Sequence, residues 1–286
     1  ELRECGHEGT ARAYASSLRS MQRYLGKKDF PFIKLSSRII SDYQGKLLAS
    51  GICDNTIGFY LHNIKALFRK GCREMGLELP CPFRDISIKT EKTLKRSLDP
   101  VVIKTLSAIE LEKDSPLSLA RDIFMFSFYT RGMSFVDIAL LKKRHVFPGE
   151  ICYRRHKTDQ LMRVGINKEI SRILERYKNV PGEYIFPLFP AERDPYAGYR
   201  NAYHRIRYSL GKISRVIGLE FPLRLHAARH SWATIAKVNG ASVHVIGECL
   251  GHTSEKTTRI YLKELDHSAL DAVNNQVADF ILAVDD

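Results

Sequence analysis

The chain has 286 residues, of which 44% are hydrophobic and 27% charged, a balance typical of one large or two ordinary folded domains rather than of disorder. Its formal net charge is +13, and its isoelectric point is about 9.5. A surplus of this size favours a polyanionic partner such as nucleic acid, because each cationic side chain placed on a phosphate releases a condensed counterion. A basic but merely solvated surface is the plainer alternative.

Cysteine usage and hydropathy exclude several classes of protein. The six cysteines form no Cys-x-x-Cys pair, which argues against a zinc ribbon and a disulfide framework and suits a reducing cytoplasm. No apolar stretch reaches the roughly 18 residues that span a bilayer, and no secretory signal opens the chain. We therefore expect a cytoplasmic protein without a membrane segment. The first residue is Glu1 rather than a methionine, which leaves room for an upstream segment.

Residues 1–87 have the periodicity of a helical domain. Apolar side chains recur every three or four residues within 11–24, from Ser36 or Ser37 to just before Gly51, and from residues 54–56 to Gly76. The polar residues at 54–56 offer an N-cap for the third helix, and Gly76 offers its stop. Several basic side chains fall on or beside the polar face of that helix, where a solvated surface explains each of them: Lys65, Arg69, Lys70 and Arg73.

Pro80 and Pro82 end this helical pattern. Residues 88–98 are polar, charged and without an apolar face, which indicates an interdomain linker. A basic linker beside a basic helical domain could close around a duplex, although flexibility alone explains the composition as well. The predicted organisation is a helical domain at 1–87, a linker at 88–98 and a larger domain at 99–286.

The larger domain is predicted to combine helices with one hairpin. Ser115 before Pro116 is a good helix start, and the apolar stretch that follows is expected to be buried. Residues 151–155 and 161–166 alternate in polarity on either side of 156–160, which is the pattern of a β-hairpin. Further helices are predicted near residue 168 and at 202–218, 225–239, 242–250 and 254–265.

The second half of the chain carries side chains suited to one kind of chemistry. His226 and Arg229 are three residues apart on a predicted helix and therefore share a face. His252 follows a Leu-Gly pair and precedes Tyr261 by nine residues. Lys157 lies at the tip of the predicted hairpin.

Phosphodiester transfer to a side-chain nucleophile without a metal needs these residue types. Guanidinium groups bind non-bridging oxygens as charge develops on them, and histidine or lysine handles the protons of the nucleophile and the leaving group. Tyrosine can attack and later leave, so religation needs no ATP. The sequence has no His-Glu-x-x-His motif, no Walker A loop and no acidic cluster for two metals. We expect neither a metal nor a cofactor.

Each element has a structural explanation when taken alone. A helical His226 and Arg229 pair is more often structural than catalytic, and Tyr261 by itself would be a packing residue. His230, four residues after His226, suggests a metal-binding histidine pair, but no third ligand is placed nearby. The conjunction of these elements in one chain is what favours a catalytic site.

This conjunction resembles the tyrosine recombinase, or phage integrase, family, in particular integrases of mobile elements from Bacteroides-type bacteria. The family signature is a His-x-x-Arg box, a Leu-Gly-His box and a tyrosine nine residues after that histidine. Residues 226–229, residues 250–252 and Tyr261 match it in order and spacing, and Lys157 followed by Thr158 matches the family's hairpin lysine. The resemblance covers nearly the whole chain.

The resemblance implies a fold as well as an activity. We expect a mainly α protein with a small antiparallel β-sheet, built as a C-shaped clamp of two domains. Residues 1–87 would be the helical, SAM-like core-binding domain, and residues 99–286 the catalytic tyrosine recombinase domain.

One departure concerns the family's first catalytic arginine, which stands three residues before an acidic residue. Ser134 occupies that slot ahead of Asp137, while Arg131 lies three positions upstream. Ser134 and Asp137 also fit the spacing of a helix capping box, which gives both a structural role. We predict that Arg131 supplies the displaced guanidinium from the preceding turn.

The resemblance assigns a role to each candidate residue. A tyrosine attacks the scissile phosphate to give a 3′-phosphotyrosine and a free 5′-hydroxyl, two arginines and one histidine bind non-bridging oxygens, a lysine protonates the 5′ oxygen, and another histidine takes or holds the tyrosine proton. Tyr261 would be the nucleophile, and Arg131, Arg229 and His252 would bind the non-bridging oxygens. Lys157 would protonate the 5′ oxygen, and His226 would take or hold the tyrosine proton.

The implied partner is a double-stranded DNA recombination site, bound by a homotetramer that exchanges strands through a Holliday junction. Such a recombinase would integrate or excise a mobile element on the bacterial nucleoid, alone or with accessory DNA-bending proteins. The tail at 271–286 has apolar residues at helical spacing, and its helix would pack on its own domain or on a neighbouring protomer.

Two other classes of protein stay open at this point. A type IB topoisomerase would use nearly the same chemistry to relax DNA as a monomer, although the short basic helical domain and the Leu-Gly-His box favour a recombinase. A non-catalytic DNA-binding protein on a degenerate recombinase fold is the other alternative, and Ser134 is its only support.

Overall fold

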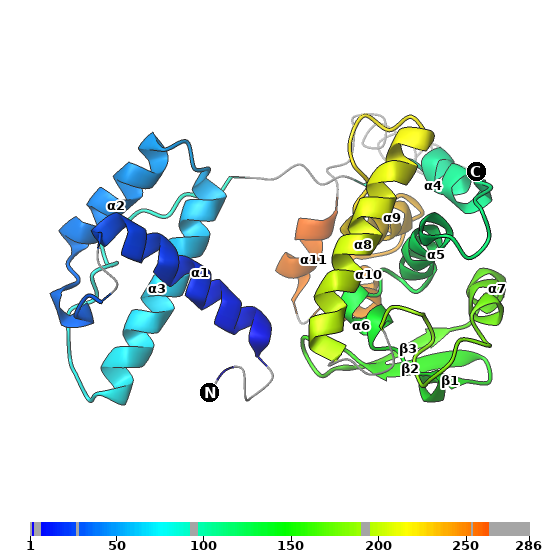
Figure 1. Cartoon of the computed structure of the whole chain (residues 1–286), viewed down its shortest axis with the longest axis horizontal. Helices are drawn as coiled ribbons and strands as arrows, with labels where there is room; N and C mark the ends of the chain where they lie inside the picture. Colours follow the sequence, from blue (N-terminus) through cyan, green and yellow to red (C-terminus); the bar gives the residue numbers. More distant parts are fainter. Residues whose placement is uncertain are drawn as a thin grey trace, which may run out of the picture. The chain divides into compact units, whose positions relative to one another are not determined.

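The computed structural model describes residue 2 and residues 7–26, 29–91, 97–189, 195–252 and 254–262. The chain divides into two compact units, Glu1–Thr93 and Leu94–Asp286 (Figure 1). Their boundary falls within the segment 88–98 that the sequence indicates as a linker. The predicted tail helix at 271–286 lies outside the described residues.

The N-terminal unit is built from three helices whose apolar faces meet in one core. Tyr43 is fully buried there and donates a hydrogen bond of 2.8 Å to Ser20. The three predicted helices are confirmed. The N-cap of the third is Cys53, whose side chain makes no cap hydrogen bond, and not one of the polar residues 54–56 as predicted. The elements are α1 (Glu8–Leu25), the 3₁₀ helix η1 (Phe32–Lys34), α2 (Ser37–Ala49) and α3 (Asp54–Glu74).

The residues that follow α3 are fastened to this unit. Asn55 brackets Glu91, donating from Nδ2 to its carbonyl oxygen at 3.0 Å and accepting from its backbone N–H at 3.1 Å. Gln44 donates to the carbonyl oxygen of Ser87. A Cβ at Gly58 would lie 3.1 Å from Ile88, so the chain passes close over α3. The first residues of the predicted linker therefore belong to the N-terminal unit.

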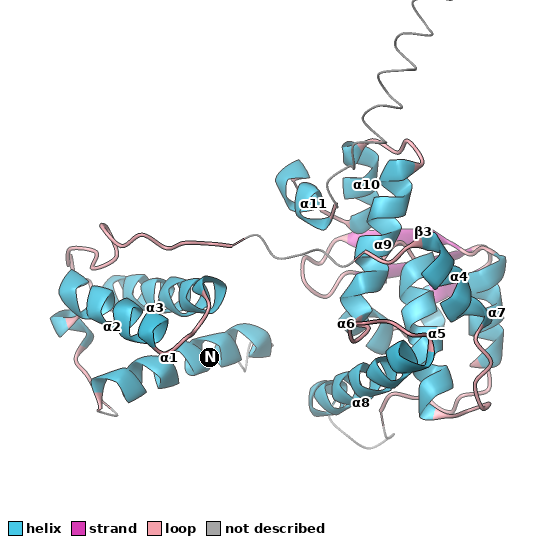
Figure 2. Cartoon of the chain, turned by 90° about the horizontal axis from the view of Figure 1, so that it is seen from above, coloured by secondary structure: helices cyan, strands magenta, loops and turns pink. Residues whose placement is uncertain are grey.

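The C-terminal unit is organised around α5, which contacts α4, α6, α7, α8 and α9 (Figures 1 and 2). Ser115 caps α5 and Pro116 opens it, as predicted. Ile123, Phe124 and Phe126 are fully buried, which confirms the expectation of an interior helix. The helices are α4 (Pro100–Ala108), α5 (Pro116–Tyr129), α6 (Phe135–Ala139), η2 (Lys143–His145), α7 (Lys168–Arg176), α8 (Pro195–Val216), α9 (Leu225–Val238), α10 (Val243–Leu250) and α11 (Glu255–Tyr261).

A three-stranded antiparallel sheet of order β1-β2-β3 completes the unit, with strands at Val146–Phe147, Glu150–Arg154 and Leu161–Gly165. Ile151 pairs with Val164 and Tyr153 with Met162, and these buried side chains form its inner face. The predicted hairpin is thus confirmed, while β1 and the short helices α4 and α6 were not predicted. The fold is mainly helical with a small antiparallel sheet, as expected.

The chain enters the C-terminal unit against α9. The backbone N–H of Leu98 donates to Ser231 Oγ at 2.7 Å, and Ser231 is fully buried. Among the described residues, no helix is long and apolar enough to cross a membrane.

Candidate active site

Arg229 is the centre of the candidate site. It lies on α9, is 5% exposed, and donates from Nη1 to the Gly132 carbonyl oxygen at 2.8 Å and from Nη2 to that of Leu250 at 2.5 Å. Its Nε is buried and bonds to no described residue. Burial, together with the charge of Arg155, lowers the pKa of Arg229 to about 10, which still leaves the guanidinium charged at neutral pH. The side chain is therefore a fixed cation with an unused donor.

The turn after α5 is shaped to receive Arg229. Gly132 has φ +75°, and a Cβ there would lie 2.5 Å from Arg229 Cγ and 2.8 Å from its Cα. Only glycine fits this conformation and this approach. Arg131, at φ +59°, is the residue just before it and is partly buried. The structure thus places Arg131 in the turn that packs on Arg229.

The Leu-Gly-His box joins the helices to the hairpin. Gly251 ends α10 in a left-handed conformation with φ +64°, and a Cβ there would lie 2.9 Å from Met162 Sδ on β3. Arg155, at the end of β2, donates from Nη1 to the Gly251 carbonyl oxygen. Lys157 follows in the exposed turn of the hairpin and lowers the pKa of His252 by its charge. The hairpin turn and the box therefore lie together.

His252 is held in one tautomer. Its Nε2 lies 3.0 Å from Arg229 Nη2, which can only donate, so Nε2 accepts. Its Nδ1 lies 3.0 Å from the hydroxyl of Thr258, a fully buried residue on α11, and therefore carries the proton. Burial first, and then the charges of Arg229, Arg155 and Lys157, lower the pKa of His252 to about 4. The ring is neutral at physiological pH.

Tyr261, the last residue of α11, lies among the other candidates. Its ring centroid is 5.4 Å from that of His226, 4.9 Å from that of His252 and 4.9 Å from that of His230. The guanidinium carbon of Arg229 lies 5.2 Å from the same centroid. The structure therefore brings Tyr261, His226, Arg229 and His252 into one cluster, as the sequence motifs predict.

The structure adds Arg155, which the sequence motifs did not single out. Its charge contributes to the lowered pKa of both Arg229 and His252. Arg131, Arg155 and Arg229 all act on Tyr153, where they oppose the rise in pKa that burial causes. One signal could have drawn attention to Arg155: it stands two residues before Lys157, in the same predicted hairpin.

Ser134 has a structural role in this molecule. Its side chain caps α6, and its hydroxyl donates to Asp137 Oδ2 at 2.5 Å. Asp137 is 5% exposed, and its Oδ1 accepts the backbone N–H of His156 at 2.8 Å. The pair that the sequence marked as a capping box therefore also fastens the hairpin turn that carries Arg155 and Lys157.

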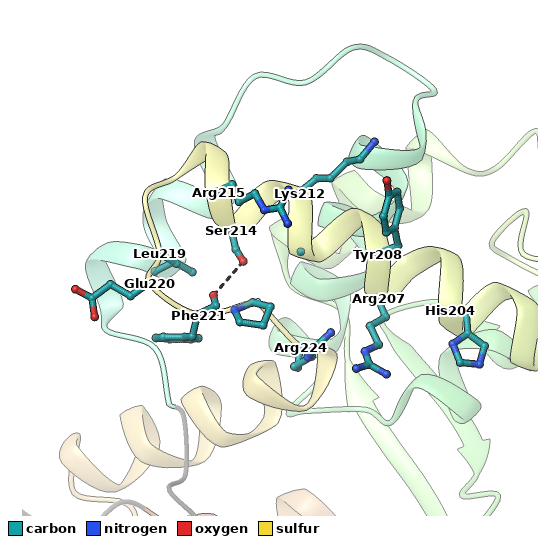
Figure 3. Close-up of a pocket in the computed structure, with 12 residues that line it drawn as sticks. His204, Arg207, Tyr208, Lys212, Ser214, Arg215, Leu219, Glu220, Phe221 and Arg224 are labelled. Carbon is teal, nitrogen blue, oxygen red and sulfur yellow. Dashed lines mark hydrogen bonds between the residues drawn. The ribbon is translucent and has the colours of Figure 1, made fainter.

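A basic hollow of about 480 Å³ lies beside α8, next to the segment that leads into α9. Arg207, Lys212, Arg215 and Arg224 line it together with one carboxylate, Glu220. Figure 3 shows the side chains of Arg207 and Arg224 extending towards the same space. Arg224 stands two residues before His226, so this surface continues towards the candidate site. Among the described residues, no group of three histidine, cysteine or acidic side chains is placed to hold a metal ion.

This helical unit gathers arginines, histidines and one tyrosine, the residue types that metal-free DNA strand transfer requires. The chain belongs to the phage integrase family: the model of that family matches residues 97–267, and the model of the phage integrase SAM-like domain matches residues 1–83. It is a site-specific tyrosine recombinase. This identification decides against the topoisomerase and the non-catalytic alternatives.

Individual relatives and solved structures agree with the family. Tyrosine recombinase XerC of Shewanella oneidensis is 26% identical over 226 residues, which cover 76% of this chain and 70% of XerC. A lambda integrase (75–356) dimer bound to a COC′ core site has a TM-score of 0.65 at 18% identity, covering 88% of this chain and 89% of that one. A lambda integrase tetramer bound to a Holliday junction has a TM-score of 0.62 at 17% identity, covering 88% and 72%.

Proposed function

We propose that this recombinase cleaves and rejoins double-stranded DNA through a 3′-phosphotyrosine on Tyr261, and that it integrates or excises a mobile element. The observation that carries the proposal is the position of the Tyr261 ring, within 5.5 Å of two histidine rings and the Arg229 guanidinium. Such a cluster places a nucleophile, proton carriers and a phosphate-binding cation within reach of one phosphate.

Arg229 would hold the scissile phosphate. Its guanidinium is already anchored by two carbonyl oxygens, so binding a phosphate costs little further ordering of the side chain. Its buried Nε has no described partner and would gain one in a non-bridging oxygen. A fixed, desolvated cation of this kind stabilises the charge that develops on those oxygens in the transition state.

Two arginines compete for the role of second guanidinium. Arg131 is the candidate that the sequence supplies, from the turn packed on Arg229. The contacts favour Arg155, because it bonds to Gly251 beside His252 and its charge acts on both Arg229 and His252. We therefore propose that Arg155 approaches the phosphate from the hairpin, and that Arg131 acts at longer range.

The remaining steps move protons. The Tyr261 oxygen attacks phosphorus while its proton passes to His226, which is exposed to the site. The bond from phosphorus to the 5′ oxygen breaks, and Lys157 protonates that oxygen to give the free 5′-hydroxyl. His252 would take up a proton from solvent at Nε2 and donate a hydrogen bond to a non-bridging oxygen, because the phosphate charge raises the pKa that burial and Arg229 now depress. Attack by a second 5′-hydroxyl then reverses these steps.

The basic hollow beside α8 would follow the DNA backbone on either side of the scissile phosphate. Arg207, Lys212 and Arg215 are exposed to solvent, so they can reach phosphates. As with the lambda integrase bound to a Holliday junction, a tetramer is proposed as the assembly that exchanges both strand pairs. The site of action would be the nucleoid in the bacterial cytoplasm, and accessory DNA-bending proteins would be compatible with it.

The test is covalent trapping on DNA. A duplex that carries the element's end, nicked just past the cleavage site, loses its short 5′-hydroxyl fragment after attack, so the phosphotyrosine accumulates. We expect a detergent-resistant protein–DNA complex with the wild-type chain and none with Tyr261→Phe, which keeps the ring but lacks the nucleophile. Equal complexes from both proteins, or none from either on both ends of the element, would refute the proposal.

A further inference from the structure

His230 has no role in the chemistry described above, and no third ligand among the described residues joins it and His226 to hold a metal ion. It follows Arg229 on α9 and is 9% exposed. Its Nδ1 lies 3.1 Å from the backbone carbonyl oxygen of Tyr261, and its ring stacks on the Tyr261 ring at 4.9 Å with an interplanar angle of 27°. The same residue thus contacts both the backbone and the ring of the nucleophile.

The hydrogen bond has a defined direction. A backbone carbonyl oxygen only accepts, so Nδ1 of His230 must carry the proton and donate. Tyr261 is the last residue of α11, and the final carbonyl groups of a helix have no partner within the helix. His230 therefore satisfies a group that the seven-residue helix leaves unpaired, and ties the end of α11 to α9.

The ring contact fixes a second degree of freedom. A tyrosine ring at a helix end can turn about its side-chain torsions, and an offset stack restricts that rotation. The edge of the His226 ring also meets His230, at 4.9 Å and 81°. His226, which would receive the tyrosine proton, is therefore held by the same neighbour as the tyrosine itself.

We propose that His230 is a positioning residue that holds Tyr261 in the active site of its own chain, through the Nδ1 hydrogen bond and the ring stack. This inference rests on the proposed function of Tyr261 as the nucleophile. It assigns the second histidine of the His-x-x-Arg-His stretch to nucleophile placement rather than to a metal.

Three substitutions separate the two contacts. His230→Asn places an amide nitrogen at the position of Nδ1, so it keeps the hydrogen bond to Tyr261 but loses the ring stack. His230→Phe keeps the ring stack but loses the hydrogen bond. His230→Gln places its amide at the position of Nε2 and loses both contacts. From the usual strengths of a hydrogen bond and an aromatic pair, single-turnover cleavage of the nicked duplex should fall roughly three- to tenfold for His230→Asn and His230→Phe. For His230→Gln it should fall roughly tenfold to a hundredfold, with DNA affinity unchanged in all three.

The matched control lies one turn further along α9. Thr234 Oγ1 is buried and bonds to no described residue, so Thr234→Val removes a polar atom of the same helix without touching Tyr261. This variant should cleave like the wild type. A His230→Gln variant that cleaves as well as His230→Asn would overturn the role of the Nδ1 bond.

A spectroscopic readout separates positioning from general damage to the fold. With 3-fluorotyrosine at position 261, the fluorine resonance should be shifted by the stacked ring in the wild type and in His230→Phe, and should move towards its solution value in His230→Gln. Melting temperatures identify any variant that loses its fold, and the comparison then uses the remaining ones. Reduced cleavage with an unmoved resonance in His230→Gln would overturn the proposal.

Mixed protomers test whether the hold acts within one chain. In a mixture of Tyr261→Phe and His230→Gln, the intact tyrosine and the intact His230 are on different chains, so cleavage should stay low. Recovery of cleavage would show that His230 serves a neighbour's tyrosine instead. Failure of the proposed function is recognised separately, because the wild-type chain itself would then form no covalent complex.

Discussion

Replacing Gly132 by alanine should disable the site although no proposed catalytic residue is replaced. The new Cβ would lie 2.5 Å from Arg229 Cγ, 2.7 Å from its Cβ and 2.8 Å from its Cα. These atoms belong to the backbone and the stem of the side chain, so no flexible end can move aside. Either the turn carrying Arg131 lifts away or Arg229 does.

Two costs add at this position. A left-handed conformation at φ +75° costs a non-glycine residue about 1–2 kcal/mol, and overpacking a closed contact costs about 1–3 kcal/mol. The stability of the C-terminal unit should therefore fall by about 2–5 kcal/mol. If Arg229 gives way, one phosphate-binding donor is misplaced, for which a loss of roughly 100- to 1000-fold in cleavage is expected.

Gly149→Ala is the matched control. Gly149 also has a positive φ, +83°, but an added Cβ would meet nothing within 4 Å. It carries the backbone cost alone, so its melting temperature should fall less and its cleavage rate should stay at the wild-type value. Melting curves and single-turnover cleavage of the nicked duplex measure both effects.

A Gly132→Ala variant that melts no lower than Gly149→Ala and cleaves at the wild-type rate would contradict this prediction. That outcome would mean that Arg229 does not depend on the Gly132 carbonyl oxygen and the close approach of the turn for its position.

Three further predictions concern the electrostatics of the site. Arg155→Ala should reduce cleavage of the nicked duplex roughly 100-fold or more, as expected for a lost phosphate donor, and Arg131→Ala should reduce it less. The reverse order would show that Arg131, and not Arg155, supplies the second guanidinium. His252 has a pKa of about 4 in the folded chain against 6.5 unperturbed, so between these pH values the unfolded state binds a proton that the folded state does not. The melting temperature of the DNA-free protein should therefore fall as the pH drops from 6.5 towards 4, and it should fall less steeply in His252→Gln. Equal slopes in the two proteins would contradict the lowered pKa of His252. Replacing Arg207 and Arg224 by glutamine should lower the slope of log affinity for duplex DNA against log salt by about 2, since each phosphate contact contributes about 0.9, whereas Lys178→Gln on the surface after α7 should leave that slope unchanged.

Much of the fold could be predicted because its signals are local. The caps Ser36 and Ser115 and the stop before Gly51 mark helix ends that depend on hydrogen bonds within a few residues. The alternation around 156–160 likewise identifies the hairpin. Strand β1, with two residues, and α6, with five, are too short for a periodic pattern, and they form because neighbouring elements hold them.

The site was predictable only where spacing along the chain carries the information. His226, Arg229, His252 and Tyr261 fall in motifs of fixed spacing, so their clustering follows from two helices and a turn. Arg155 reaches the Gly251 carbonyl oxygen across 96 residues of sequence, and no local pattern encodes such a contact. Asp137 looked like a helix cap, and its second function appears only because the hairpin turn returns beside α6.

The anchors at Glu91 and Leu98 limit the length of chain that joins the two units. Asn55 fixes the chain on one side and Ser231 on the other, so seven peptide steps join the anchors and reach at most about 25 Å. That is less than one turn of duplex DNA, roughly 34 Å. Once one unit has bound DNA, this short connection holds the other unit at a high effective concentration. Inserting residues between the two anchors should therefore weaken DNA binding by the whole chain without changing the affinity of each unit for DNA.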